Sequence, residues 1–213
     1  MISEERIRTF INSLDQGNDE FLDELEKEAL ADDVPIIRKD TQSLIRFLLT
    51  LERPLNILEV GCAVGFSALL MARYSEDNAK ITTIEKFEKR IPVAKRNFEK
   101  YDEKKKITLL EGDAAEILAE LDGQYDFIFM DAAKGQYLNF LPDCKRLLRK
   151  GGLLLSDNVL QDGDVMESRF AVTRRNRTIH ERMRDYLFAI KHDPELESVI
   201  LTVGDGMAIS VKK

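Results

Sequence analysis

The chain has 213 residues, 44% of them hydrophobic and 33% charged, which favours one globular domain over residues 1–213. It has no run of about 18 apolar residues and no signal-type apolar stretch near its charged N-terminus, so we expect a cytoplasmic protein that does not enter a membrane. The formal net charge of −7 argues against a general nucleic-acid coat, and the distant Cys62 and Cys144 indicate reduced thiols.

Residues 1–52 are expected to form an N-terminal helical part of that domain. Apolar side chains recur at helical spacing over residues 3–14 and about 19–31, and Gly17 and Asn18 interrupt the pattern. Asp40 is expected to cap a third helix with the sequence TQSLIRFLLTL.

The pattern changes at residue 55 and predicts a sheet-containing core over residues 55–213. Near-continuous apolar runs alternate with amphipathic stretches, which is typical of parallel strands covered by helices on both faces. The runs are NILEV, KITTIE, ITLLEG, YDFIFMD and GGLLLSD. At the end of the chain, GDG separates SVILTV from MAISVKK and predicts a hairpin. The predicted fold class is therefore α/β, a parallel sheet with an antiparallel C-terminal pair, and ligands are expected at the carboxyl ends of its strands.

The first three strand ends predict an adenosyl ligand with an amino-acid tail. Glu59 precedes a loop of the form G-x-x-x-G, where an acid would repel a pyrophosphate but suit an ammonium group. Glu85 ends the second strand and could accept hydrogen bonds from ribose hydroxyls, and Asp113 follows the third strand and could meet an adenine amino group. The alternatives are a tight turn with Ser67 capping a helix, a solvated Glu85, and Asp113 acting only as a helix cap. S-adenosylmethionine fits these features better than NAD.

The fourth and fifth strand ends predict a metal site. Asp131 ends the fourth strand, Lys134 follows it, and Asp157 and Asn158 end the fifth. Two carboxylates and an amide oxygen suit Mg²⁺ or Ca²⁺, and the set lacks the Cys or His that zinc favours. The alternative is that these acids cap helices. Lys134 could accept a proton, stabilise an oxyanion, or simply be solvated.

Taken together, these motifs resemble the metal-dependent S-adenosylmethionine O-methyltransferases, which include the catechol and caffeoyl-CoA enzymes. The resemblance covers roughly residues 35–213 and rests on E-V-G-x-x-x-G-x-S, the acid after the second strand, G-D-A, M-D-A-x-K and S-D-N. It implies a seven-stranded Rossmann-like sheet with a reversed last strand, Mg²⁺ as a cofactor and a homodimer. Ala133 departs from the polar residue of many relatives, which puts in doubt a substrate contact there. By position, the resemblance assigns cofactor binding to Glu59, Gly61, Ser67, Glu85, Asp113, Ala114 and Asp131, metal binding to Asp131, Asp157 and Asn158, and a catalytic role to Lys134.

A second resemblance concerns the segment TRRNRTIHERMRDY, residues 173–186. It is similar to the bacterial branch that methylates 5-hydroxyuridine at the wobble position of tRNA and forms 5-methoxyuridine. This implies that Arg174, Arg175 and Arg177 contact the tRNA anticodon loop, since arginines bind phosphates and stack on bases.

Four interpretations remain open from the sequence. The first is a tRNA methyltransferase, and the local charge reversal favours it over the alternative that the arginines belong to a surface helix with salt bridges or to a dimer interface. The acceptor could be a small catechol-type or caffeoyl-CoA-like molecule, because a catechol and 5-hydroxyuridine both offer two neighbouring oxygens. An NAD(P)-dependent oxidoreductase is disfavoured by the missing G-x-G-x-x-G motif. A non-catalytic cofactor- or RNA-binding module is the fourth interpretation.

Overall fold

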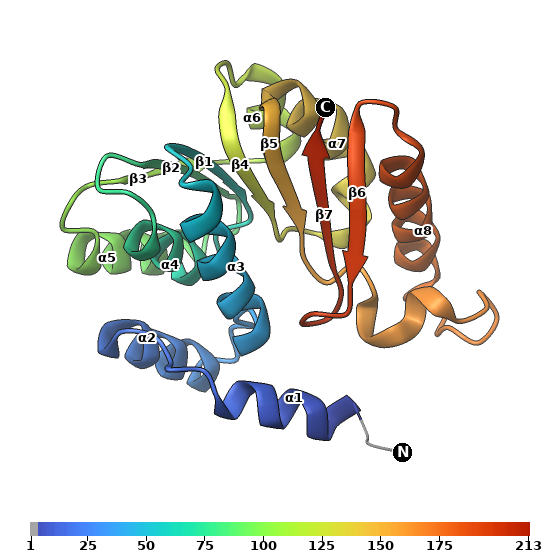
Figure 1. Ribbon diagram of the computed structural model, residues 1–213, viewed down its shortest axis with the longest axis horizontal. Helices are drawn as coiled ribbons and strands as arrows, with labels where there is room; N and C mark the ends of the chain where they lie inside the picture. The colour runs from blue at the N-terminus through green and yellow to red at the C-terminus, as the bar shows by residue number, and fades with distance from the viewer. Residues whose placement is uncertain (1–3) are drawn as a thin grey trace.

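The computed structural model describes residues 4–213 and shows one seven-stranded sheet in the order β3-β2-β1-β4-β5-β7-β6 (Figure 1). Strands β1 to β5 are parallel, whereas β7 pairs antiparallel with both β5 and β6. The predicted α/β fold with an antiparallel C-terminal hairpin is confirmed. The strands are β1 (Asn56–Val60), β2 (Lys80–Glu85), β3 (Ile107–Glu111), β4 (Tyr125–Met130), β5 (Leu148–Ser156), β6 (Leu196–Leu201) and β7 (Met207–Lys212).

Eight α-helices and two 3₁₀ turns are present in residues 4–213. They are α1 (Glu4–Ser13), α2 (Glu20–Ala31), α3 (Lys39–Glu52), α4 (Phe66–Tyr74), α5 (Ile91–Tyr101), α6 (Ala114–Glu120), α7 (Tyr137–Leu147) and α8 (Arg177–His192), with the 3₁₀ turns η1 (Lys134–Gln136) and η2 (Gln161–Met166). Within this part of the chain, no helix has the length and apolar character needed to cross a membrane. The assignment of the whole chain to one domain stays a prediction.

The start of α3 differs from its prediction. Arg38 occupies the N-cap position, and Asp40 lies in the first helical turn instead of capping it. The Asp40 carboxylate accepts a hydrogen bond from the backbone amide of Gly204, 2.9 Å away in the β6–β7 loop. Asp40 therefore connects the third helix to the C-terminal hairpin, a contact that local capping rules do not predict.

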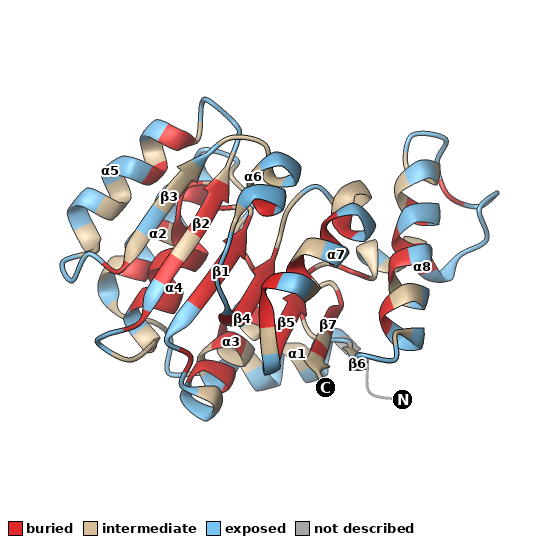
Figure 2. Cartoon of the chain, turned by 90° about the horizontal axis from the view of Figure 1, so that it is seen from above, coloured by how far each residue is buried: buried red, intermediate tan, exposed pale blue. Residues whose placement is uncertain are grey.

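The continuous apolar run of β4 is explained by two separate hydrophobic clusters, one on each face of the sheet. Phe127 and Phe129 pack with residues of α3 and α4, whereas Ile128 and Met130 pack with residues of α7 and α8. Figure 2 shows the buried central strands between helices whose outer faces are exposed. Since both faces are covered, the four residues Phe127 to Met130 are all apolar, and the polar Asp126 and Asp131 lie on either side of them.

Candidate active site

Backbone hydrogen bonds align the carboxyl ends of β1, β4 and β5 side by side. The amide of Asp131 donates to the carbonyl of Val60 at 3.0 Å, and the amide of Asp157 donates to the carbonyl of Met130 at the same distance. Gly61 lets the loop after β1 lie close to the end of β4, because a Cβ atom at this position would be 2.2 Å from the carbonyl oxygen of Asp131. Its φ of +101° also disfavours other residues. The side chains that follow these strands are thus brought together.

The ammonium group of Lys134 lies between two of the predicted metal ligands. Its Nζ donates to Asp131 Oδ1 at 2.8 Å and to Asn158 Oδ1 at 2.6 Å. The two oxygens come from different strand ends but converge on one cation. This geometry shows a position at which positive charge is favoured by two hard oxygen atoms.

Asp157 completes this cluster from a buried position, with 1% of its surface exposed. Its Oδ1 accepts a hydrogen bond from the amide of Asn158 at 2.8 Å, and burial together with the nearby Asp131 carboxylate raises the pKa of Asp157. Asn158 has a φ of +56°, an uncommon backbone conformation for a residue other than glycine. Positive charge near these two carboxylates would offset both the burial of Asp157 and its repulsion with Asp131.

Tyr137 is a residue of this site that the sequence interpretation missed. It is fully buried, and its hydroxyl lies 3.1 Å from the carbonyl of Met130 and 3.0 Å from the carbonyl of Asp157. Lys134 Nζ lies 3.4 Å from the same hydroxyl. Tyr137 therefore ties the ends of β4 and β5 to the lysine. The sequence feature that could have identified Tyr137 is its position three residues after Lys134, a spacing that brings two side chains together in one turn of a helix.

On the other side of the site, Glu85 orders the loop that follows β1. Its Oε2 accepts a hydrogen bond from the amide of Ala63 at 2.7 Å, and its Oε1 accepts from the amides of Lys86 and Phe87. Because three backbone amides fix the carboxylate, the acceptor capacity that remains on its oxygens has a constant direction. The predicted ribose-binding position is therefore rigid.

Asp113 caps α6, which was one of the two roles predicted for it; the other was a contact with an adenine amino group. Its Oδ1 accepts a hydrogen bond from the amide of Ala115 at 2.9 Å, and its Oδ2 pairs with Lys86 Nζ at 3.2 Å. Hydrogen bonding to the backbone and to Lys86 lowers the pKa of Asp113. The adjacent Ala114 begins the helix and has no side-chain polar group, so it can serve a ligand only through its backbone or by van der Waals contact.

Glu59 lies beneath the site, and its surface is fully buried. Its carboxylate accepts hydrogen bonds from the hydroxyls of Ser67 and Thr83, and burial raises its pKa to about 7. Glu59 is not among the residues that line the cavity described below. Its placement therefore supports a role in holding the β1–α4 connection more than a direct contact with a ligand.

The two groups of strand-end residues share one cavity of ≈ 690 Å³. This size is in the range of small-molecule and cofactor sites. Segments that precede α3, begin η2 and join β6 to β7 also contribute, through Arg38, Asp162 and Asp205. The predicted site residues that line the cavity are Gly61, Ser67, Glu85, Asp113, Ala114, Asp131, Lys134, Asp157 and Asn158.

The predicted RNA-contact arginines do not line the cavity. Arg174 and Arg175 are exposed on the segment between η2 and α8, and neither has a hydrogen bond or ion pair within residues 4–213. Arg177 is half-buried and donates to the carbonyl of Val172 at 3.3 Å. The segment follows η2, whose Asp162 lines the cavity, so the two exposed arginines are joined through η2 to an element of the cavity wall.

The donor set at β4 and β5 fits a hard divalent cation. Within the described part of the chain, no group of three or more His, Cys, Asp and Glu side chains could hold a metal. The candidate ligands are instead two carboxylates and one amide oxygen, those of Asp131, Asp157 and Asn158. Three oxygen ligands would leave positions for water or substrate, as a catalytic Mg²⁺ site requires.

Three comparisons place the chain among known proteins. The O-methyltransferase family model matches residues 12–213. Caffeoyl-CoA O-methyltransferase 1 of Eucalyptus globulus is 33% identical over 183 residues, which cover 80% of this chain and 72% of the plant protein. A catechol O-methyltransferase of Niastella koreensis is 35% identical over 116 residues, covering 53% of this chain and 52% of that protein.

Solved structures share the whole architecture. One from Staphylococcus aureus has a TM-score of 0.90 and 32% identity, covering 99% of this chain and 100% of its own. A SAH-bound methyltransferase from Podospora anserina has a TM-score of 0.88 and 26% identity, covering 100% of this chain and 97% of its own. With the match of the family model over nearly the full length, the chain belongs to the O-methyltransferase family.

Proposed function

We propose that this chain is a metal-assisted O-methyltransferase that uses S-adenosylmethionine and an acceptor with two neighbouring oxygens. The observation that carries the proposal is the single cavity lined by both groups of strand-end residues. One group, around Gly61, Glu85 and Asp113, has the polar groups that an adenosyl ligand needs. The other, around Asp131 and Asp157, has the oxygen ligands and the lysine that an acceptor hydroxyl needs.

The cofactor half of the proposal rests on the rigid Glu85 and the glycine loop. Glu85 would accept hydrogen bonds from the ribose hydroxyls, and Asp113 would meet the adenine amino group. Gly61 lets the backbone approach the ligand, and Ser67, held by Glu59, closes the loop. The SAH-bound relative from Podospora anserina supports this assignment, since SAH is the product of methyl transfer from S-adenosylmethionine.

In the acceptor half, Asp131, Asp157 and Asn158 would hold Mg²⁺. When bound, the ion would supply positive charge that favours the deprotonated form of an acceptor hydroxyl. Lys134 would accept the hydroxyl proton or stabilise the oxyanion, and Tyr137 would keep the lysine in place. The acceptor oxygen then forms a bond to the methyl carbon as the carbon–sulfur bond breaks, and the electron pair of that bond remains on sulfur.

For the acceptor itself, we propose 5-hydroxyuridine at the wobble position of tRNA, which would give 5-methoxyuridine. O5 and the O4 carbonyl of this base are the two neighbouring oxygens. The exposed Arg174 and Arg175 favour an RNA acceptor, because they have no protein partner in residues 4–213 and belong to the segment that follows η2, whose Asp162 lines the cavity.

A small acceptor of the catechol or caffeoyl-CoA type is the second candidate. The names of the relatives favour it, since the similar proteins from Eucalyptus globulus and Niastella koreensis are caffeoyl-CoA and catechol O-methyltransferases. Vicinal hydroxyls would use the same metal ligands and the same lysine.

One experiment separates the two acceptors. Labelled S-adenosylmethionine is incubated with tRNA that carries 5-hydroxyuridine and, in parallel, with a catechol, for the wild type and an Arg174→Ala/Arg175→Ala double variant. The RNA proposal predicts that tRNA is labelled faster than the catechol and that the double variant loses tRNA labelling by about tenfold or more, because each charged contact to phosphate is strong. Labelling of the catechol alone would overturn the RNA acceptor while retaining the methyltransferase site.

A further inference from the structure

Arg38 joins three segments that are far apart in the sequence. It precedes α3 and lines the cavity. Its Nη1 donates to the carbonyl of Gly204 in the β6–β7 loop at 3.1 Å, and its Nη2 pairs with Asp162 of η2 at 2.9 Å. A Cβ atom on Gly204 would lie 3.7 Å from Asp157 Oδ1, so this guanidinium is held next to the acceptor end of the cavity.

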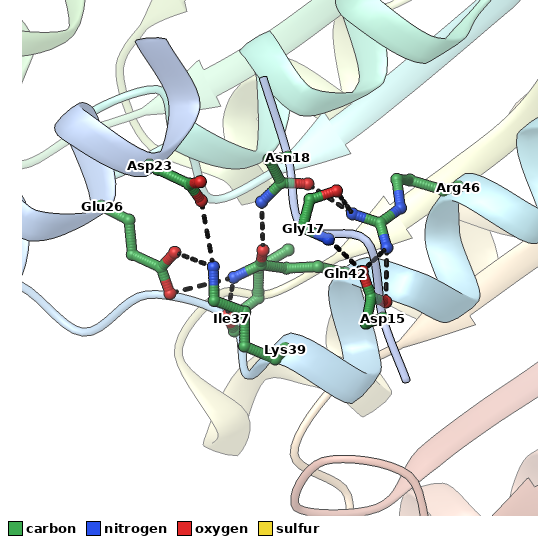
Figure 3. Close-up of polar contacts among 9 residues, drawn as sticks. All are labelled: Asp15, Gly17, Asn18, Asp23, Glu26, Ile37, Lys39, Gln42 and Arg46. Atoms are coloured by element: carbon green, nitrogen blue, oxygen red, sulfur yellow. Dashed lines mark hydrogen bonds and ion pairs between the residues drawn. The ribbon is translucent and has the colours of Figure 1, made fainter. Parts of the chain in front are cut away.

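The backbone around Arg38 is anchored independently of its side chain. Gln42 is fully buried, and its Nε2 donates to the carbonyl of Ile37 at 2.8 Å, while its amide donates to the carbonyl of Arg38 at 2.9 Å. On the other side, Lys39 pairs with Glu26 of α2 at 2.5 Å (Figure 3). The guanidinium can therefore exchange partners while the main chain stays in place.

The ion pair of Arg38 is also redundant as a connection between the segments. The amide of Asp162 donates to Asp205 Oδ1 at 2.5 Å, which ties η2 to the hairpin, and Asp40 binds the amide of Gly204, which ties α3 to it. The carboxylate of Asp162 is 81% exposed, and exposed ion pairs contribute only about 0–1 kcal/mol. The pair can thus be broken at small cost.

Positive charge is scarce at the acceptor end of the cavity. Of the basic side chains that line it within residues 4–213, Lys86 is paired with Asp113 on the cofactor side, and Lys134 is held between Asp131 and Asn158. Arg90 follows β2 on the cofactor side of the sheet. Arg38 is consequently the cation best placed to meet an anionic part of the acceptor.

We propose that Arg38 binds a phosphate next to the reacting nucleoside and that Asp162 is a competing anion that this phosphate displaces. The inference rests on the proposed RNA acceptor and assigns Arg38 as the residue that selects a nucleotide over a phosphate-free molecule. A guanidinium binds phosphate through two parallel hydrogen bonds, a stronger arrangement than its single bond to the exposed Asp162.

The proposal predicts effects of opposite sign for the two partners. Affinity for an anticodon stem-loop RNA that carries 5-hydroxyuridine is measured in the presence of S-adenosylhomocysteine. Arg38→Ala is expected to weaken binding by about tenfold or more, because a charge-assisted bond is lost. Asp162→Asn is expected to tighten binding about two- to fivefold, because the competitor is removed. Arg53→Ala is the matched control, since Arg53 forms an exposed ion pair with Glu76 and does not line the cavity.

The outcomes distinguish this inference from the proposed function. If Arg38→Ala and Asp162→Asn both weaken RNA binding, the pair is a structural clamp and the inference is overturned. The inference is also overturned if Arg38→Ala weakens the binding of the free nucleoside 5-hydroxyuridine and the binding of the RNA by equal factors, since the nucleoside has no phosphate. Affinity for S-adenosylhomocysteine within twofold of wild type shows that each variant is folded. Wild-type methylation of the same RNA is measured in parallel. If the wild type does not methylate this RNA, the proposed acceptor is overturned. If the wild type methylates it but Arg38→Ala binds the RNA with unchanged affinity, only the role of Arg38 is overturned.

Discussion

Replacing Glu59 with glutamine should change how the stability of the protein depends on pH. Glu59 is fully buried, and burial raises its pKa from the usual 4.5 to about 7. A carboxyl group that holds its proton more tightly in the folded state stabilises the fold at low pH, and this contribution is lost as the pH rises from about 4.5 to about 7. Glutamine cannot ionise, so the variant should not show this loss.

The expected magnitude follows from the two pKa values. Between pH 5 and pH 8, wild type should lose about 2–3 kcal/mol of unfolding free energy relative to Glu59→Gln, since each pKa unit corresponds to about 1.4 kcal/mol. In a chain of this length, that difference corresponds to roughly 5–10 °C in Tm. Urea unfolding of the ligand-free protein at both pH values measures it.

The control for this prediction is Glu116→Gln, which removes the same charge from the exposed surface of α6. It should change the pH dependence by only a few tenths of a kcal/mol, as surface substitutions usually do. If Glu59→Gln and wild type lose the same unfolding free energy between pH 5 and pH 8, the argument that Glu59 is a desolvated carboxyl group beneath the site is refuted.

Three further substitutions test the geometry of the site. Gly61→Ala should destabilise the protein by more than about 3 kcal/mol in urea unfolding, because its Cβ would clash with the carbonyl of Asp131. Gly123→Ala, with a similar φ of +106° and no atom within 4 Å, should cost only about 1–2 kcal/mol, and equal losses would contradict the clash. Tyr137→Phe removes a hydroxyl bound to two strand-end carbonyls, so it should lower the unfolding free energy by about 1–3 kcal/mol and reduce kcat. An unchanged kcat would show that Tyr137 does not support the reaction. Lys134→Ala should lower kcat by about 10²–10⁴-fold while the affinity for S-adenosylhomocysteine stays within twofold, and a kcat within threefold of wild type would exclude a catalytic lysine.

The strand ends were predictable because polar residues interrupt apolar runs there. In the sequence YDFIFMD, four apolar residues must be buried on both faces, and the aspartate that follows is the first position with access to a ligand. The same reasoning located Asp157 and Asn158, and parallel strands with aligned ends then bring all three together. Local sequence thus predicts which side chains converge at the strand ends when the topology of the sheet is simple, whereas their assignment to a metal stays a prediction.

Contacts between segments far apart in the chain were not predictable. The ion pair of Arg38 with Asp162 spans 124 positions, and no periodicity or capping rule relates the two residues. The two buried oxygens of Glu59 accept hydrogen bonds from hydroxyl groups of α4 and β2, and the sequence pattern does not predict that these segments meet there. Periodicity also predicted α1 correctly without showing what covers it, since Phe10 and Leu14 are 65% and 67% exposed. The homodimer stays a prediction.

The most direct test of the account is the dependence of methyl transfer on a divalent cation. Transfer from labelled S-adenosylmethionine to 5-hydroxyuridine tRNA and to a catechol is measured in Mg²⁺, in EDTA, and in EDTA followed by excess Mg²⁺, with S-adenosylhomocysteine binding measured under each condition. The account predicts that transfer to the acceptor is lost in EDTA and restored by Mg²⁺, while S-adenosylhomocysteine binding is unchanged, because different strand ends serve the metal and the cofactor. Equal rates of transfer in EDTA and in Mg²⁺ would contradict a metal site formed by Asp131, Asp157 and Asn158.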